Sequence, residues 1–241
     1  MATIAAPVKR HVNTDRIFFP AMCVLILVTV WLGFSKTYYG VGMVRAHLPA
    51  PIIHVHAVVF TLWLLTLIMQ IGLVRAKKVQ IHRKLGLWGF GLAATMVVVG
   101  LMAGTNALRR NMSPPGSGLD PKVFYIVPVS GILTFGFLVG WAYLARRRPM
   151  EHKRLIIFAS LAILDAAIGR FPYTIMPMGP MTQSLILIGL MLPMLVYDLV
   201  TLKKLNRVTI ISFLLIVALL FTRIPLGMTS PWLKFATFMH G

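Results

Sequence analysis

The fold of this chain is indicated first by two similar stretches, Ile81-His82-Arg83-Lys84-Leu85-Gly86 and Glu151-His152-Lys153-Arg154-Leu155-Ile156. Each follows an apolar segment and a group of basic residues, and each begins the next apolar segment, so one unit is used twice. Histidine titrates near neutrality and is a common metal ligand, which suggests redox, metal or proton chemistry at a membrane edge. The alternative is that both histidines anchor the first turn of a helix at the headgroup boundary.

The composition predicts an integral membrane protein. Of 241 residues, 58% are hydrophobic and only 12% are charged, and the mean hydropathy is +0.84. The apolar stretches run to about 20 residues without the alternation of a β-barrel, so helices should cross the bilayer. We predict an all-α bundle, a single transmembrane domain over 1–241, with seven spans at 17–36, 51–74, 85–106, 123–145, 155–171, 183–202 and 208–225.

The net charge of +19 reflects topology rather than nucleic-acid binding, because the basic residues do not form one patch. Most of them lie at the N-terminus and in the turns after the second, fourth and sixth spans. The positive-inside rule then predicts an N-in, C-out orientation, with 1–16 in the cytoplasm and 226–241 as an outer tail. These basic turns should attract anionic lipids at the cytoplasmic face.

The spans are expected to form three hairpins with cytoplasmic turns. The first two turns lead to His82 and His152, and in the third, Asn206 stands where the others have histidine. The outer segment 172–182 and the tail from Pro225 onward should cap the mouth of the bundle. The single cysteine excludes an internal disulfide and a cysteine-based metal site.

Polar residues inside the spans are the main candidates for function, because burying a charge at the centre of a bilayer costs roughly 2.5–3.5 kcal/mol. On the second span, His56, Trp63 and Gln70 recur at seven-residue intervals and therefore lie on one face of the helix. At 1.5 Å per residue, His56 and Asp165 should lie about 7 Å and about 10 Å below the outer boundary. The sequence therefore predicts an outer-half ligand site formed by His54, His56, Trp63, Gln70, Asp165 and Arg170.

Three of these residues also have less specific interpretations. His54 and His56 are about 200° apart on a helix, so together they are a weak metal signal. Asp165 and Arg170 are five residues apart and each should have its partner elsewhere, so Asp165 could simply fix helix packing. Asp198, near the inner end of the sixth span, is expected to pair with Arg146, Arg147 or Arg148.

Several phrases resemble a known family. They are Gly33-Phe34-Ser35-Lys36-Thr37-Tyr38-Tyr39, His54-Val55-His56-Ala57, Trp63 with Gln70, His82-Arg83-Lys84-Leu85-Gly86, His152-Lys153-Arg154-Leu155 and Ala167-Ile168-Gly169-Arg170. Through about residue 207 the chain resembles uncharacterised bacterial polytopic membrane proteins similar to the DUF2306 family. The resemblance implies a multi-pass fold in the bacterial inner membrane and a set of recurring polar positions, and it brings no activity.

Three functions fit these observations. The first, which we favour, is a binding or redox protein that holds haem b, a metal ion or a quinone, with His82 and His152 as candidate haem or metal ligands. The second is a small-molecule or proton-coupled transporter that uses His56, Asp165 and Arg170. The third is a noncatalytic accessory or scaffold subunit with membrane-protein partners. The apolar run 208–222 lacks the lysine of a retinal protein, and no catalytic motif is present, so the sequence leaves open whether the protein is an enzyme.

Overall fold

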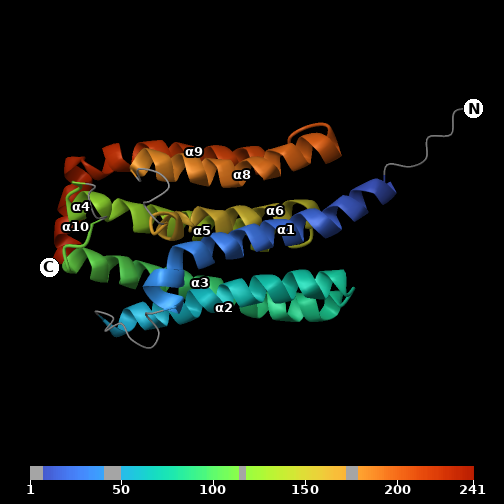
Figure 1. The fold of residues 1–241 in the computed structure, drawn as a ribbon, viewed down its shortest axis with the longest axis horizontal. Helices are drawn as coiled ribbons and strands as arrows, with labels where there is room; N and C mark the ends of the chain where they lie inside the picture. Colours follow the sequence, from blue (N-terminus) through green and yellow to red (C-terminus); the bar gives the residue numbers. More distant parts are fainter. Residues whose placement is uncertain (1–7, 41–49, 114–117, 172–178) are drawn as a thin grey trace, which may run out of the picture.

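The computed structural model describes residues 8–40, 50–113, 118–171 and 179–241, and the regular structure within these ranges is entirely helical. The helices run roughly side by side in one elongated bundle (Figure 1). In chain order the elements are α1 (Val8–Phe34), the π-helical segment η1 (Ser35–Tyr39), α2 (Pro51–Arg75), α3 (Val79–Arg109), α4 (Pro121–Phe124), α5 (Ile126–Leu144), α6 (Pro149–Ala162), α7 (Asp165–Ile168), α8 (Pro180–Leu202), α9 (Arg207–Gly227) and α10 (Ser230–His240). The predicted all-α class is therefore confirmed for the described residues.

Six segments in these ranges are long and apolar enough to cross a membrane: Thr14–Tyr39, Pro51–Arg75, Val79–Arg109, Pro121–Leu144, Met181–Leu202 and Arg207–Gly227. Even the shortest, at 21 residues, spans about 30 Å, which is the thickness of a bilayer's hydrocarbon core. Large apolar side chains cover the outside of the bundle, and Trp88 and Phe238 are each 80% exposed. Such an exterior suits lipid rather than water. The chain is a multi-pass membrane protein.

The count of seven spans is not confirmed, because the predicted span 155–171 is a broken helix. α6 ends at Ala162 and α7 begins at Asp165, so neither reaches spanning length. At the break the Leu164 N–H donates to the carbonyl of Leu161, three residues back rather than four, at 3.0 Å. A tightened turn of this kind often marks a hinge or a strained sequence. The break makes Asp165 the first residue of a new helical segment.

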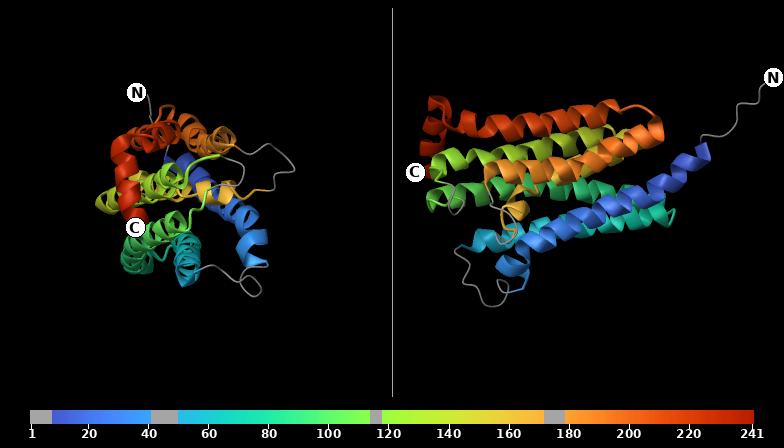
Figure 2. Two further views of the ribbon diagram at one scale, coloured as in Figure 1. Left: turned by 90° about the vertical axis from the view of Figure 1, so that its left-hand side faces the viewer. Right: turned by 45° about the horizontal axis from the view of Figure 1, so that its top comes forward.

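The three basic turns lie at the same end of the bundle. In Figures 1 and 2 the turns after α2, α5 and α8 lie at the end where α1 begins, and α10 lies across the opposite end. We call these the basic-turn end and the α10 end. This arrangement agrees with the three hairpins expected from the sequence. Part of the predicted cap, 172–178, lies outside the described residues, whereas α10 packs against α3, α4 and α9 as a cap.

The core of the bundle is centred on α6. Figure 1 shows α5 and α6 between the α2–α3 pair and the α8–α9 pair, with α1 beside them. Almost every residue from Arg154 to Ala162 is buried, and large side chains such as Phe135, Phe158 and Ile26 fill the space around them. Because α6 has protein on all sides, its polar residues must find partners within the bundle.

Candidate functional site

The clearest polar site joins α7 to α9. Asp165, the first residue of α7, forms an ion pair with Nη1 of Arg223 near the α10 end of α9. Their side chains are only 13% and 7% exposed. The ion pair uses Oδ2, whereas Oδ1 of Asp165 is buried and has no hydrogen-bond partner. One carboxylate oxygen therefore remains able to accept a proton or a hydrogen bond.

A small cavity lies beside this ion pair. Its volume is about 20 Å³, which is room for roughly one water molecule. Asp165 and Arg223 line it together with Ser130 and Thr134 of α5, and the apolar residue Ile216 of α9 closes part of its wall. A cavity with charged and hydroxyl groups in its wall can hold a hydrogen-bonded water, unlike an apolar void.

Two buried hydroxyl groups lie further along the same face of α9. Ser212 and Thr209 are both fully buried, and neither side-chain oxygen has a hydrogen-bond partner in the described structure. Helical rise places Ser212 about 6 Å from Ile216, in the direction of the basic-turn end. Thr209 lies about 4.5 Å further along the helix. The face of α9 that points into the bundle therefore has polar groups on both sides of the apolar residue Ile216. Arg223 lies toward the α10 end, and Ser212 and Thr209 lie toward the basic-turn end.

A second buried ion pair lies toward the basic-turn end. Arg154 of α6 and Asp198 of α8 are both 0% exposed, and Nε of Arg154 donates to Oδ1 of Asp198 at 3.0 Å. The other oxygen of Asp198 accepts the backbone N–H of Asn206 at 3.0 Å. The carboxylate thus ties α6, α8 and the start of α9 together.

This pairing corrects the sequence prediction for Asp198. We expected Arg146, Arg147 or Arg148 as its partner, but Arg148 pairs with Glu151 at 3.2 Å and is itself exposed. The error came from assigning the aspartate to the interface. Asp198 lies inside the bundle, so its partner has to come from a buried helix face.

A third acidic residue extends the network to α1. Asp15 accepts hydrogen bonds from Lys153 of α6 and from the hydroxyl of Tyr197 of α8. The ammonium of Lys153 also lies 4.5 Å from the ring centre of Phe19, and Phe18 stacks on Tyr197 at 4.1 Å. These contacts fix the part of α1 near the basic-turn end against α6 and α8.

The predicted outer-half residues divide into several groups. His54 and His56 begin α2 at the α10 end, and Arg170 lies close enough to His56 for an electrostatic interaction. The π-helical segment η1 brings Tyr38 toward α2, and its hydroxyl lies 3.5 Å from Nδ1 of His54. The His56 ring stacks on Phe60 at 3.9 Å. These predicted residues therefore form a cluster of aromatic and basic side chains at the α10 end of α2.

The remaining members of that predicted set lie elsewhere. Trp63 is at mid-height, where its indole N–H donates to Ser160 of α6 at 3.2 Å. Gln70 is at the basic-turn end, where it lies against Gly86 of α3. Seven-residue spacing keeps residues on one face, but two such steps move about 21 Å along the axis. One compact site therefore cannot contain both His56 and Gln70, because they lie in opposite halves of the bundle.

The structure also corrects the proposed equivalence of Asn206 with the two histidines. Asn206 is the N-cap of α9, and its side chain accepts the N–H of Val208 at 2.9 Å. α3 and α6 have Lys78 and Arg148 at the N-cap, so both histidines lie four residues inside their helices. The position equivalent to theirs in α9 is Ile210. Asn206 in the third turn is therefore no evidence for or against a ligand role of His82 and His152.

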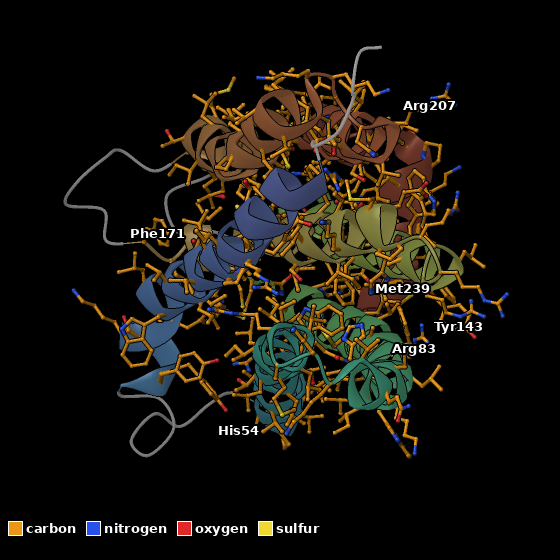
Figure 3. The ribbon with its side chains drawn as sticks, turned by 90° about the vertical axis from the view of Figure 1, so that its right-hand side faces the viewer. His54, Arg83, Tyr143, Phe171, Arg207 and Met239 are labelled. Atoms are coloured by element: carbon orange, nitrogen blue, oxygen red, sulfur yellow. The ribbon has the colours of Figure 1, made fainter. Side chains whose placement is uncertain are left out.

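The rings of the two histidines meet edge to face at the basic-turn end. The ring centres of His82 and His152 are 6.4 Å apart and the rings are nearly perpendicular, at 84°. Figure 3 looks onto this end and shows the labelled residues Arg83, Tyr143 and Arg207 around the rim of the bundle. Within the described ranges, no group of three or more His, Cys, Asp or Glu side chains converges as a metal site.

Sequence reasoning missed Arg223, Arg154, Ser212 and Thr209. Arg223 lies close to the end of the predicted span 208–225, where flanking charges are expected, so it did not stand out. The signal that could have found it is a lone arginine inside an otherwise apolar span. Thr209 and Ser212 carry no comparable signal, because hydroxyl side chains often bond to their own helix.

Fold and buried polar groups together define a multi-pass helical membrane protein with ionisable residues in its interior. In comparisons with family models, curated proteins and solved structures, nothing matches this chain.

Proposed function

We propose that this protein conducts protons through the interior of the bundle, with Asp165 as the central proton-binding group. The observation that carries the proposal is the unpartnered Oδ1 of Asp165 beside a water-sized polar cavity. The proposal develops the transporter alternative, with Arg223 in place of His56 and Arg170 as the partner of Asp165.

The ion pair supplies two states of the site. While Asp165 is ionised, it holds Arg223 through Oδ2. A proton arriving at Oδ1 neutralises the carboxylate and removes most of the attraction for the guanidinium. Loss of the proton restores the ion pair.

The polar groups along α9 supply a route toward the basic-turn end. Hydroxyl groups both donate and accept hydrogen bonds, so Ser212 and Thr209 can pass a proton between waters. The apolar side chain of Ile216 separates these hydroxyl groups from the cavity. It therefore interrupts the chain of hydrogen bonds and prevents an uncontrolled leak of protons. Beyond Thr209 the route reaches Asn206 and the Arg154–Asp198 pair.

Orientation and location complete the proposal. The basic turns face the cytoplasm of a bacterium, the protein is N-in and C-out in the inner membrane, and α6 with α7 forms a short seventh segment. Charge distribution supports this orientation, and the resemblance to the DUF2306 family supports the bacterial membrane. On this basis Asp165 takes protons from the outer side.

Proton flux into liposomes tests the function. Purified protein is reconstituted around the pH dye pyranine, and valinomycin with a potassium gradient drives proton entry. We expect wild-type protein to acidify the interior well above the rate of empty liposomes, and Asp165→Asn to lower the protein-dependent rate at least tenfold. Asp120→Asn, which removes the exposed carboxylate that caps α4, is the matched control and should keep the full rate.

Two outcomes would reject the proposal. One is a wild-type rate equal to that of empty liposomes, and the other is an Asp165→Asn rate equal to wild type. Gel filtration and circular dichroism of each variant show whether the bundle is intact, and Asp165→Glu, which keeps the titrating group, should retain part of the flux.

A further inference from the structure

We propose that the outward face of α10 binds an anionic phospholipid, with the lipid phosphate at Lys234 and an acyl chain along Phe235 and Phe238. α10 lies across one end of the bundle, directly after the spanning helix α9 (Figure 1). This surface is separate from the Asp165 site, so the proposal does not depend on proton conduction. It also holds whichever side of the membrane α10 faces.

The position of α10 sets its depth in the membrane. α9 is 21 residues long and therefore crosses about 30 Å, the hydrocarbon thickness of a bilayer. α9 ends at Gly227 and α10 begins at Ser230, so α10 lies close to the edge of that hydrocarbon layer. At this level a lysine reaches the phosphates of the headgroups while aromatic side chains contact the upper parts of the acyl chains.

One face of α10 is fixed against the bundle. Ala236 is fully buried, and the indole N–H of Trp232 donates to the carbonyl oxygen of Lys122 at 2.9 Å. Toward the C-terminal end of the helix, Nε of Arg109 donates to the carbonyl oxygen of Met239 at 3.1 Å. These contacts determine which side of α10 faces away from the protein.

The outward face carries polar side chains around one hollow. At about 100° per residue, positions 230, 234 and 237 lie within roughly 60° of one another on a helix. Ser230, Lys234 and Thr237 line an open hollow of about 420 Å³ together with Leu233. All three polar side chains are exposed, and within the described residues none of them has a hydrogen-bond or ion-pair partner. One ammonium and two hydroxyl groups are therefore free to donate into the same hollow.

A lipid phosphate matches these donors in charge. Phosphate oxygens accept hydrogen bonds, and lysine binds phosphate as a point charge. The carboxylate of Asp120, on the neighbouring α4, accepts the backbone N–H of Lys122 at 2.7 Å and forms no ion pair with Lys234. Lys122 and Arg109 both contact α10 through hydrogen bonds and add positive charge beside it. The positive charge of Lys234 is therefore available to an anion.

The apolar flank of α10 selects a lipid over a soluble anion. Phe235 and Phe238 are both exposed, and Trp232 packs beside Phe235 with ring centres 5.4 Å apart. On the helix, Phe238 lies about 40° from Lys234, and Phe235 about 60° further round. One phospholipid can therefore place its phosphate at Lys234 while an acyl chain covers both phenyl rings. A soluble anion would leave both rings uncovered.

Native mass spectrometry of the detergent-purified full chain tests the affinity. Wild-type protein is titrated with phosphatidylglycerol and, separately, with phosphatidylcholine that has the same acyl chains. The basic turns also attract anionic lipid, so the readout is the difference between variants. We expect Lys234→Gln to weaken one phosphatidylglycerol site about fivefold. Ser230→Ala combined with Thr237→Val should weaken the same site roughly twofold to tenfold.

A matched control separates this site from general attraction of lipid by basic residues. Lys36→Gln removes an exposed lysine of η1 at the same end of the bundle and should bind phosphatidylglycerol like wild type. Lys234 is exposed and makes no contact that the fold requires, and gel filtration of Lys234→Gln checks that the protein is intact. Equal affinities of wild type and Lys234→Gln would overturn the proposal.

Photocrosslinking locates the bound lipid without any variant. Phosphatidylglycerol with a diazirine in its acyl chain is added to wild-type protein and irradiated, and the labelled peptides are sequenced. We expect label on α10 at Phe235 or Phe238, and much less label there from the matching phosphatidylcholine. Equal labelling by the two lipids, or no label on α10, would reject the anionic site. If soluble glycerol phosphate protects α10 as well as unlabelled phosphatidylglycerol does, the ligand is a soluble anion and the lipid proposal fails.

Discussion

Arg154 and Asp198 form an ion pair in which neither side chain has any exposed surface. The guanidinium donates through Nε and Nη2 to one carboxylate oxygen and through Nη1 to the Met150 carbonyl at 2.6 Å. The second carboxylate oxygen accepts the Asn206 N–H. Full hydrogen bonding is the condition under which a buried ion pair is tolerated. The pair therefore connects three helices at the basic-turn end.

Removing either partner of this pair should destabilise the protein strongly. Arg154→Ala or Asp198→Asn leaves a buried group uncompensated, and such losses are about 3–5 kcal/mol. The free energy of unfolding in mixed detergent measures this directly. Arg148→Ala, which breaks the exposed Arg148–Glu151 pair, should cost less than about 1 kcal/mol. Equal losses at the two sites would contradict the burial argument.

The helices were largely predictable because their signals are local. An apolar run predicted 51–74, and α2 covers Pro51–Arg75. The starts of α3 and α6 were predicted six residues late, at 85 and 155 instead of 79 and 149. Hydropathy treats the basic residues there as loop, although long basic side chains at a helix end extend toward the headgroups.

The site was less predictable because its contacts are distant in sequence. Asp165 was correctly singled out as a buried charge with a partner elsewhere, yet that partner is 58 residues away on α9. Likewise, Arg154 and Asp198 are 44 residues apart. Depth estimates from helical rise place residues at a level in the membrane, but they do not tell which faces of two helices meet.

A glycine in α1 should be intolerant of any side chain. A Cβ at Gly33 would lie 2.2 Å from the carbonyl oxygen of Ala167, which is rigid backbone of α7. Gly33→Ala should therefore force α1 away from α7 and cost about 1–3 kcal/mol. Gly140→Ala is the matched control, because nothing lies within 4 Å of that Cβ. Thermal unfolding should show a lower midpoint for the first variant and an unchanged or higher one for the second.

The hydrogen bond from Trp63 to Ser160 should measurably couple α2 to α6. The indole N–H and the hydroxyl oxygen are 3.2 Å apart, and both side chains are buried. In a cycle of Trp63→Phe, Ser160→Ala and the double variant, we expect a coupling energy of about 0.5–1.5 kcal/mol. Strictly additive losses would show that the bond contributes nothing to stability.

Fusion reporters should establish the orientation. The charge distribution predicts that the turns after α2, α5 and α8 face the cytoplasm and that α10 is outside. Alkaline phosphatase fused after His240 should then be active, and green fluorescent protein at the same place should be dark. A fusion in the turn at Lys203 should give the reverse result. The opposite pattern would reverse the direction proposed for proton movement.

Paired substitutions at Asp165 and Arg223 should separate stability from proton flux. Asp165→Asn alone leaves Arg223 buried without its counter-charge, so we expect a loss of about 3–5 kcal/mol in unfolding free energy. Adding Arg223→Gln removes that isolated charge, and the amide pair can hydrogen-bond across the same gap, so most of the stability should return. The proton-binding carboxylate is still absent, however, so flux into liposomes should stay at least tenfold below wild type. If flux recovered together with stability, Asp165 would be a packing residue and the proton pathway would have to lie elsewhere in the bundle.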